Sequence, residues 1–129
     1  MEIKEILGYY YVFKYRTKQQ AHVYRLHLFL GDVSNELVFK LERNISGHFG
    51  SVGNDWFGNC TLERDEIILN ATKEIDWRFT FLQDERQDVV SECDKTWKGV
   101  FTWDNNDLKL DIDKEVLKLP MYKTIKNEH

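Results

Sequence analysis

Leu7-Gly8-Tyr9-Tyr10-Tyr11-Val12-Phe13-Lys14-Tyr15 is the stretch of sequence that decides the fold. Its odd positions are all large and apolar or aromatic, whereas its even positions include Gly8, Val12 and Lys14. A period of two is typical of a strand with one buried face, because successive side chains point to opposite sides of a sheet. The stretch therefore predicts a strand over residues 6–16 whose aromatic face another part of the sheet must cover.

The same alternation recurs along the chain, and no long helical stripe interrupts it. Turn-forming residues such as Gly31-Asp32-Val33-Ser34-Asn35 separate the segments. Two regions are less regular: residues 46–59 hold four of the seven glycines, and residues 84–96 read as a strand with loops. The predicted strands are 6–16, 21–30, 36–45, 60–63, 66–71, 74–83, 97–103, 107–113 and 115–123.

These segments predict an all-β protein. Roughly nine short strands, about ten residues apart, suit a β-sandwich or barrel. Short connections favour up-and-down order, and closure removes exposed strand edges. We therefore expect a single antiparallel up-and-down β-barrel of about 8–10 short strands that forms one domain over residues 1–129.

Composition excludes several classes of function. The net charge is −4 and no block of Lys or Arg runs along the chain, so general nucleic-acid binding is not expected. The first residues lack the apolar core of a signal peptide, and no run approaches the roughly 20 apolar residues of a membrane span. The sequence thus predicts a cytoplasmic protein whose two cysteines, Cys60 and Cys93, are free thiols.

The chain resembles the lipocalin-like, or calycin, barrels. The resemblance rests on Gly8 before an aromatic first strand, on Asp55-Trp56-Phe57-Gly58 before Thr61-Leu62, and on Trp97-Lys98-Gly99-Val100-Phe101 before the last hairpin. Gly8-Tyr9-Tyr10 stands where true lipocalins carry Gly-x-Trp. The resemblance implies a ligand cavity inside the barrel and no catalysis.

No motif indicates a catalytic or metal site, and no cofactor is expected. His22 and His27 point to opposite faces of one strand, and no Cys-x-x-Cys or His-x-His is present. Nothing brings His48 to Cys60 as a nucleophile pair would require. The glycine-rich loop 47–53 lacks the Gly-Lys-Ser/Thr of a phosphate loop. It is either a flexible connection or a lid over a barrel mouth.

The aromatic residues are either simple core packing or the lining of a cavity. Tyrosine and tryptophan carry a polar group that is costly to bury without a partner, so their concentration hints at a pocket. A mid-strand arginine pointing inward would bind a carboxylate or phosphate strongly. The candidate ligand-binding residues are Tyr9, Tyr11, Tyr24, Arg25, Arg43, Trp56, Trp77, Arg78 and Trp103.

Two functions stay open from the sequence. The first is a non-enzymatic barrel that binds a lipid, a heterocycle or a nucleotide signal in an aromatic-lined cavity, with an arginine clamp. The second is a small protein-interaction module, such as a bacterial immunity or inhibitor protein, that binds a basic partner on its acidic surface. A weaker third is an enzyme that uses the same cavity, which would require a perturbed acid or base inside it.

Overall fold

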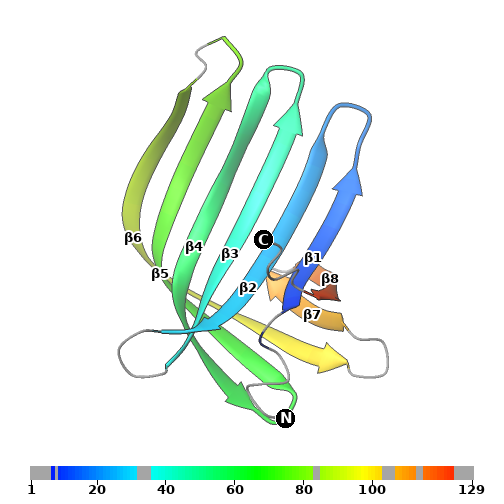
Figure 1. Ribbon diagram of the computed structural model, residues 1–129, viewed down its shortest axis with the longest axis vertical. Coiled ribbons are helices and arrows are strands. Elements are labelled where there is room, and N and C mark those ends of the chain that lie inside the picture. The colour runs from blue at the N-terminus through cyan, green and yellow to red at the C-terminus, as the bar shows by residue number, and fades with distance from the viewer. Residues whose placement is uncertain are drawn as a thin grey trace.

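The computed structural model describes residues 7, 9–31, 36–82, 85–102, 107–112 and 115–123, and within them it is all-β. Every strand is antiparallel to its neighbours, and the strand order follows the sequence around a closed barrel (Figure 1). The expected all-β, up-and-down barrel is therefore confirmed. The strands are β1 (Tyr9–Arg16), β2 (Ala21–Leu30), β3 (Leu37–Gly47), β4 (Gly50–Glu63), β5 (Glu66–Thr80), β6 (Glu85–Thr102), β7 (Asp107–Ile112) and β8 (Glu115–Lys123).

The barrel is complete only at one end. β8 pairs with β1 over Tyr9–Tyr11, and β7 pairs with β6 over Lys98–Thr102. β1 to β6 continue beyond β7 and β8 as one curved sheet, which forms the upper part of the molecule in Figure 1. We call the part completed by β7 and β8 the closed end. The part formed only by β1 to β6 is the open end.

Two long strands replace the irregular regions expected from the sequence. The glycine-rich loop is only a turn at His48–Phe49, because β4 begins at Gly50 and pairs with β3 over residues 50–59 and with β5 over residues 50–63. Residues 85–102 form one continuous strand instead of a strand with loops. The predicted strands 66–71 and 74–83 are also one strand, β5, which gives eight strands among the described residues. The positive φ of Arg64, 55°, marks the expected turn between β4 and β5.

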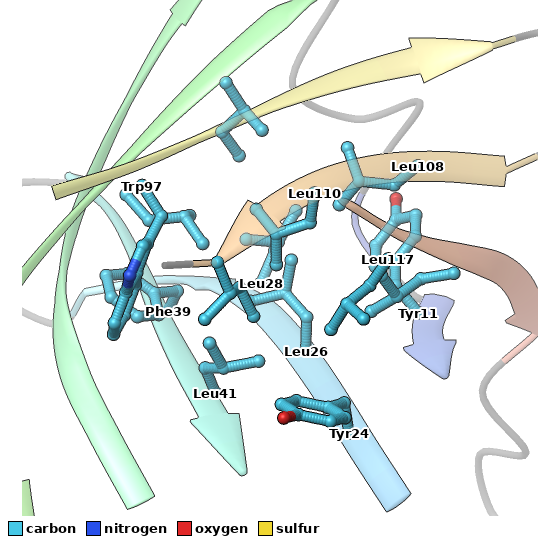
Figure 2. Packing of buried hydrophobic residues seen from close by; sticks show 14 of the residues in the cluster. Tyr11, Tyr24, Leu26, Leu28, Phe39, Leu41, Trp97, Leu108, Leu110 and Leu117 are labelled. Atoms are coloured by element: carbon cyan, nitrogen blue, oxygen red, sulfur yellow. The ribbon is translucent and has the colours of Figure 1, made fainter. Parts of the chain in front are cut away.

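The apolar core fills the closed end. Leu26, Leu41, Ile67, Leu110 and Leu119 are completely buried. Figure 2 shows the leucines of β2, β7 and β8 pointing towards one another, with Phe39 and Trp97 beside them. Each such side chain contributes about 2 kcal/mol through removal from water. The closed end is thus a packed core, and it holds the open end of the sheet in place.

A β-bulge changes which residues of β5 face inward. Ile67, Leu69 and Ala71 are buried in the core, but Thr72 is an extra residue in the pairing of β5 with β4, because Gly58 is opposite Ala71 and the next residue of β4, Phe57, is opposite Lys73. Because side chains alternate between faces, one extra residue reverses the faces of everything that follows. Beyond the bulge the even positions of β5 face inward, and Ile75 and Trp77 lie on the outer face.

Candidate functional site

The candidate site is the inner face of the open end, which we call the concave face. Pairing of β3 with β4 places Leu41 opposite Trp56 and Arg43 opposite Asn54. Residues directly opposite one another share a face. Because Leu41 is completely buried in the core, Arg43, Asn54 and Trp56 all lie on the concave face, just above the packed closed end.

Two nitrogen donors on this face are buried without a partner. The Nε of Arg43 and the Nε1 of Trp56 are shielded from solvent, and neither has a hydrogen-bond acceptor among the described residues. Trp56 is only 4% exposed. A buried donor that has lost its water without gaining an acceptor costs about 1–3 kcal/mol. Both donors are therefore suited to an acceptor that the protein itself does not supply.

A pair of carboxyl groups lies next to these donors. Glu74 is opposite Trp56 and Asp76 is opposite Asn54 in the pairing of β4 with β5. The amide of Asn54 donates to Oε2 of Glu74 at 3.1 Å and also to Oδ1 of Asp76. The bulge in β5 is what brings both carboxyl groups to the concave face.

The pKa values of the two carboxyl groups shift in opposite directions. A hydrogen bond to Glu74, burial and the charge of Glu74 together raise the pKa of Asp76. Burial opposes ionisation of Glu74, but hydrogen bonds with Asp76 and Lys95, the nearby indole N–H of Trp56 and the charge of Lys95 outweigh it, so the pKa of Glu74 is lowered. The indole acts by proximity, because its N–H misses hydrogen-bond geometry. Glu74 is consequently the more acidic member of the pair.

Lys95 of β6 completes the polar group on the concave face. Its Nζ lies 3.2 Å from Oε1 of Glu74, and the same ammonium lies 5.5 Å from the centre of the Trp56 ring. The side chain of Lys95 remains 41% exposed. One face therefore presents two carboxyl groups, a solvent-accessible ammonium and two unpartnered N–H groups on neighbouring strands.

A cavity of about 470 Å³ opens at the rim of the open end. It lies above the polar group, because Ile45 and Val52 pair directly beyond Arg43 and Asn54. Its walls combine apolar and polar side chains from β3, β4, β5 and the turns beside them, among them Ile45, His48, Phe49, Val52, Arg78 and Thr80. A volume of this size fits a small organic molecule.

The structure places the nine predicted ligand residues in different surroundings. Tyr24, Arg43 and Trp56 share the concave face, since Tyr24 is opposite Arg43 in the pairing of β2 with β3. Arg78 lines the rim cavity. Tyr11 belongs to the packed core, with its ring 5.7 Å from that of Phe101 in an edge-to-face arrangement.

The other four predicted residues do not join this group. Arg25 is exposed on the outer face of β2. Trp77 lies on the outer face of β5, where its indole donates to Asp55. The backbone of Tyr9 pairs with Lys123, but its side chain lies outside the described residues, as does the whole of Trp103.

Asn54, Glu74, Asp76 and Lys95 were not predicted from the sequence. They were missed because the apolar alternation of β5 continues through the bulge, as if one face of the strand were buried throughout. The alternating residues are Ile67, Leu69, Ala71, Ile75 and Trp77. Nothing in the local sequence marks the reversal. The pairing of β5 with its neighbouring strands shows that the polar positions turn inward.

The thiols and histidines do not form a reactive site among the described residues. Burial, aided by the charge of Glu36, raises the pKa of Cys60 to about 12. Burial and the charge of Glu74 also raise the pKa of Cys93. A raised pKa lowers the fraction of thiolate, which is the nucleophile. Within the described ranges, no three His, Cys, Asp or Glu side chains converge as a metal site would require.

Comparison with known proteins adds no family to this description. No family model matches the chain, and no significant match was found among curated proteins or solved structures. The described part of the chain contains no helix with the length and apolar character needed to cross a bilayer.

Proposed function

We propose that this protein is a non-enzymatic, calycin-like barrel that binds a small molecule on its concave face. The observation that carries the proposal is the pair of buried, unpartnered donors, Arg43 Nε and Trp56 Nε1, on one face of neighbouring strands. A ligand that supplies an acceptor to both would recover the hydrogen bonds lost on burial. Arg43 then serves as the arginine clamp expected from the sequence.

The surroundings of the donors define the chemistry of the ligand. An acceptor group, either anionic or a carbonyl or ring nitrogen, would lie against Arg43, Trp56 and the exposed ammonium of Lys95. The rest of the molecule would extend into the rim cavity between Ile45 and Val52. A lipid head group with part of its chain, a heterocycle and a nucleotide signal all satisfy this arrangement.

The free thiols suit the cytoplasmic location that we propose with this function. Cys60 and Cys93 are not joined to each other or to another cysteine. Unpaired cysteines are typical of proteins that work in a reducing compartment.

Native mass spectrometry of the purified protein, compared with the denatured sample, is the first test. We expect an excess mass that disappears on denaturation and identifies a co-purified ligand. For protein that purifies empty, thermal unfolding against a panel of lipids, heterocycles and nucleotides gives the same information, because a ligand that binds only the folded state raises the midpoint. A panel without any stabilising compound contradicts the proposal.

Two tryptophan variants locate the bound molecule. Trp56→Phe removes the unpartnered N–H and keeps most of the ring, so ligand affinity should fall by about tenfold for one lost hydrogen bond. Trp97→Phe is the matched control, because Trp97 is equally buried, at 4% exposed, and its ring centre lies 5.1 Å from that of Trp56. Equal losses in both variants would place the ligand elsewhere.

Protein binding is the second candidate, and one observation favours it. Phe49, Phe81 and Leu82 at the tips of the open end are 86%, 64% and 97% exposed. Apolar side chains exposed together are typical of interaction sites. With the net charge of −4, they would suit a basic protein partner. An empty protein that captures such a partner through these three residues would favour this function over small-molecule binding.

A further inference from the structure

One long edge of the sheet has no partner among the described strands. β6 pairs with β7 only from Lys98 onward, so among the described strands its residues 85–97 have a pairing strand on one side alone, β5. The matching edge of β1, residues 12–16, is much shorter. An open edge exposes a row of backbone N–H and C=O groups that can pair with another strand.

We propose that two copies of this chain form a dimer by antiparallel pairing of β6 with β6, around a two-fold axis at Val90. A two-fold interface brings the same surface of both copies together, so it needs an edge that is complementary to itself. Pairing about Val90 aligns residues 85–95 of each copy. Val90 then lies opposite Val90 of the second copy, and Val89 lies opposite Ser91. This proposal does not depend on the proposed ligand.

The charges along the edge complement one another in this register. Glu85 lies opposite Lys95 of the second copy and Arg86 lies opposite Asp94, and the two-fold axis repeats both pairs. Opposite charges directly across a strand pair are stabilising. Asp88 falls opposite Glu92, and these two like-charge pairs oppose the four attractive ones; the 2.6 Å contact of Asp88 Oδ1 with Arg86 Nε weakens that repulsion.

Neighbouring registers are less favourable. Both copies must keep their concave faces on the same side of a continuous sheet, so the axis can move only by whole residues along β6. An axis at Ser91 puts Asp88 opposite Asp94 and removes the contact between Glu85 and Lys95. An axis at Val89 leaves Asp94 and Lys95 beyond the paired segment. The Val90 register pairs residues 85–95 and forms four attractive pairs, whereas the Ser91 register pairs residues 85–97 and forms none.

The exposed valines of β6 support the same surface. Val89 and Val90 are 64% and 60% exposed, on opposite faces of the sheet. At the centre of the dimer Val90 would pack against Val90 of the second copy on one face, as β-branched residues do in neighbouring strands, and Val89 would cover Ser91 of the second copy on the other face. The pairing would also bring Glu85 of the second copy beside Lys95, on the concave face.

Sedimentation velocity of the purified chain over a range of concentrations tests the dimer. We expect a reversible monomer–dimer equilibrium. Val90→Lys places two ammonium groups opposite each other at the axis and should raise the dissociation constant by about tenfold. Val116→Lys is the matched control, because Val116 is 68% exposed on β8, and it should leave the equilibrium unchanged. A chain that stays monomeric throughout, or equal effects of both variants, would overturn the proposal.

Disulfide trapping tests the register. Gln87→Cys places a cysteine opposite Cys93 of the second copy, so mild oxidation with diamide should yield a covalent dimer. Adding Cys93→Ser to that variant should remove the cross-link. Ser91→Cys lies out of register with Cys93 and should cross-link several-fold less. Preferential cross-linking of the Ser91→Cys variant would contradict pairing about Val90. Assembly into oligomers larger than a dimer would indicate pairing of β6 with β1 of the next copy instead.

Discussion

The indole of Trp77 donates a 3.3 Å hydrogen bond to the carboxylate of Asp55 on the outer face of the open end. Arg86 donates to the other oxygen of the same carboxylate, also at 3.3 Å, and its guanidinium lies 4.8 Å from the centre of the Trp77 ring. The three residues come from β5, β4 and β6. They tie together the three longest strands where β7 and β8 no longer support them.

Replacing Asp55 should therefore loosen the open end. Asp55 is only 6% exposed, so Asp55→Ala leaves the Trp77 N–H without its acceptor and Arg86 with Asp88 alone. We expect the free energy of unfolding to fall by about 2 kcal/mol, measured by urea denaturation. Asp111→Ala, at an exposed position of β7, is the control. Equal and small losses in both variants would show that the Asp55 contacts contribute little.

Gly53 should not tolerate a side chain. A Cβ at this position would lie 2.2 Å from the carbonyl oxygen of Arg43 and 2.5 Å from the Trp77 ring. Gly53→Ala should therefore lower the midpoint of urea unfolding by an amount equivalent to about 2 kcal/mol. A Cβ at Gly31 would lie 3.5 Å from its nearest neighbour, so Gly31→Ala should lower the midpoint of unfolding much less. A stable Gly53→Ala protein would mean that Trp77 moves freely.

The stability of the protein should depend on pH through Asp76. Its pKa is raised above the usual 3.8, first by its hydrogen bond to Glu74, so the folded state holds this proton more tightly than the unfolded chain does. The resulting stabilisation is complete below pH 3.8 and is lost as the pH rises through the raised pKa. Glu74 has the opposite sign: its lowered pKa stabilises the fold above the usual 4.5 and ceases to do so as the pH falls through the folded value.

Asp76→Asn removes the first of these contributions. Its stability relative to the natural protein should increase as the pH rises from about 4 to about 7, because the amide cannot ionise beside Glu74. Urea unfolding at several pH values measures this difference. Parallel pH profiles of the two proteins would contradict the raised pKa of Asp76.

The two thiols should be alkylated slowly and in a fixed order. The pKa of Cys60, raised to about 12 by burial, leaves very little thiolate at neutral pH. We expect Cys93 to be modified first by iodoacetamide, followed by mass spectrometry. Cys93→Ser should remove the faster phase. Faster modification of Cys60 would show that the side chain leaves the core often.

The sequence was sufficient to predict the architecture, because the period-two pattern of β1, β2 and β3 is clear in residues such as Tyr11, Leu26 and Leu41. It also predicted the pairing of β6 with β7, where Thr102 is opposite Asp107. The inward face of β2 remained undecided, because Tyr24 and Leu26 alternate with residues that are almost as apolar, Val23 and Phe29. Burial of Leu26 and Leu28 decides it.

The candidate site was only partly predictable, and the cause is physical. Arg43, Trp56 and Tyr24 stand out as polar or aromatic side chains within strands, and they share the concave face. Trp77 was chosen on the same grounds but lies on the outer face, because the bulge after Ala71 turns it outward. A bulge depends on how a strand pairs with its neighbour, so the sequence pattern of one strand alone does not show it.

The strand order has a consequence for how the chain folds. Every pairing among the described strands joins sequence neighbours except that of β1 with β8. Neighbouring hairpins form with short loops, whereas joining β1 to β8 must overcome the closure entropy of about a hundred residues. Among the described residues of β1, only Tyr9, Tyr10 and Tyr11 provide that junction. We expect hairpin formation to precede the junction of β1 with β8, so the pairing of Tyr9–Tyr11 with β8 should form late in folding and break first when the protein unfolds.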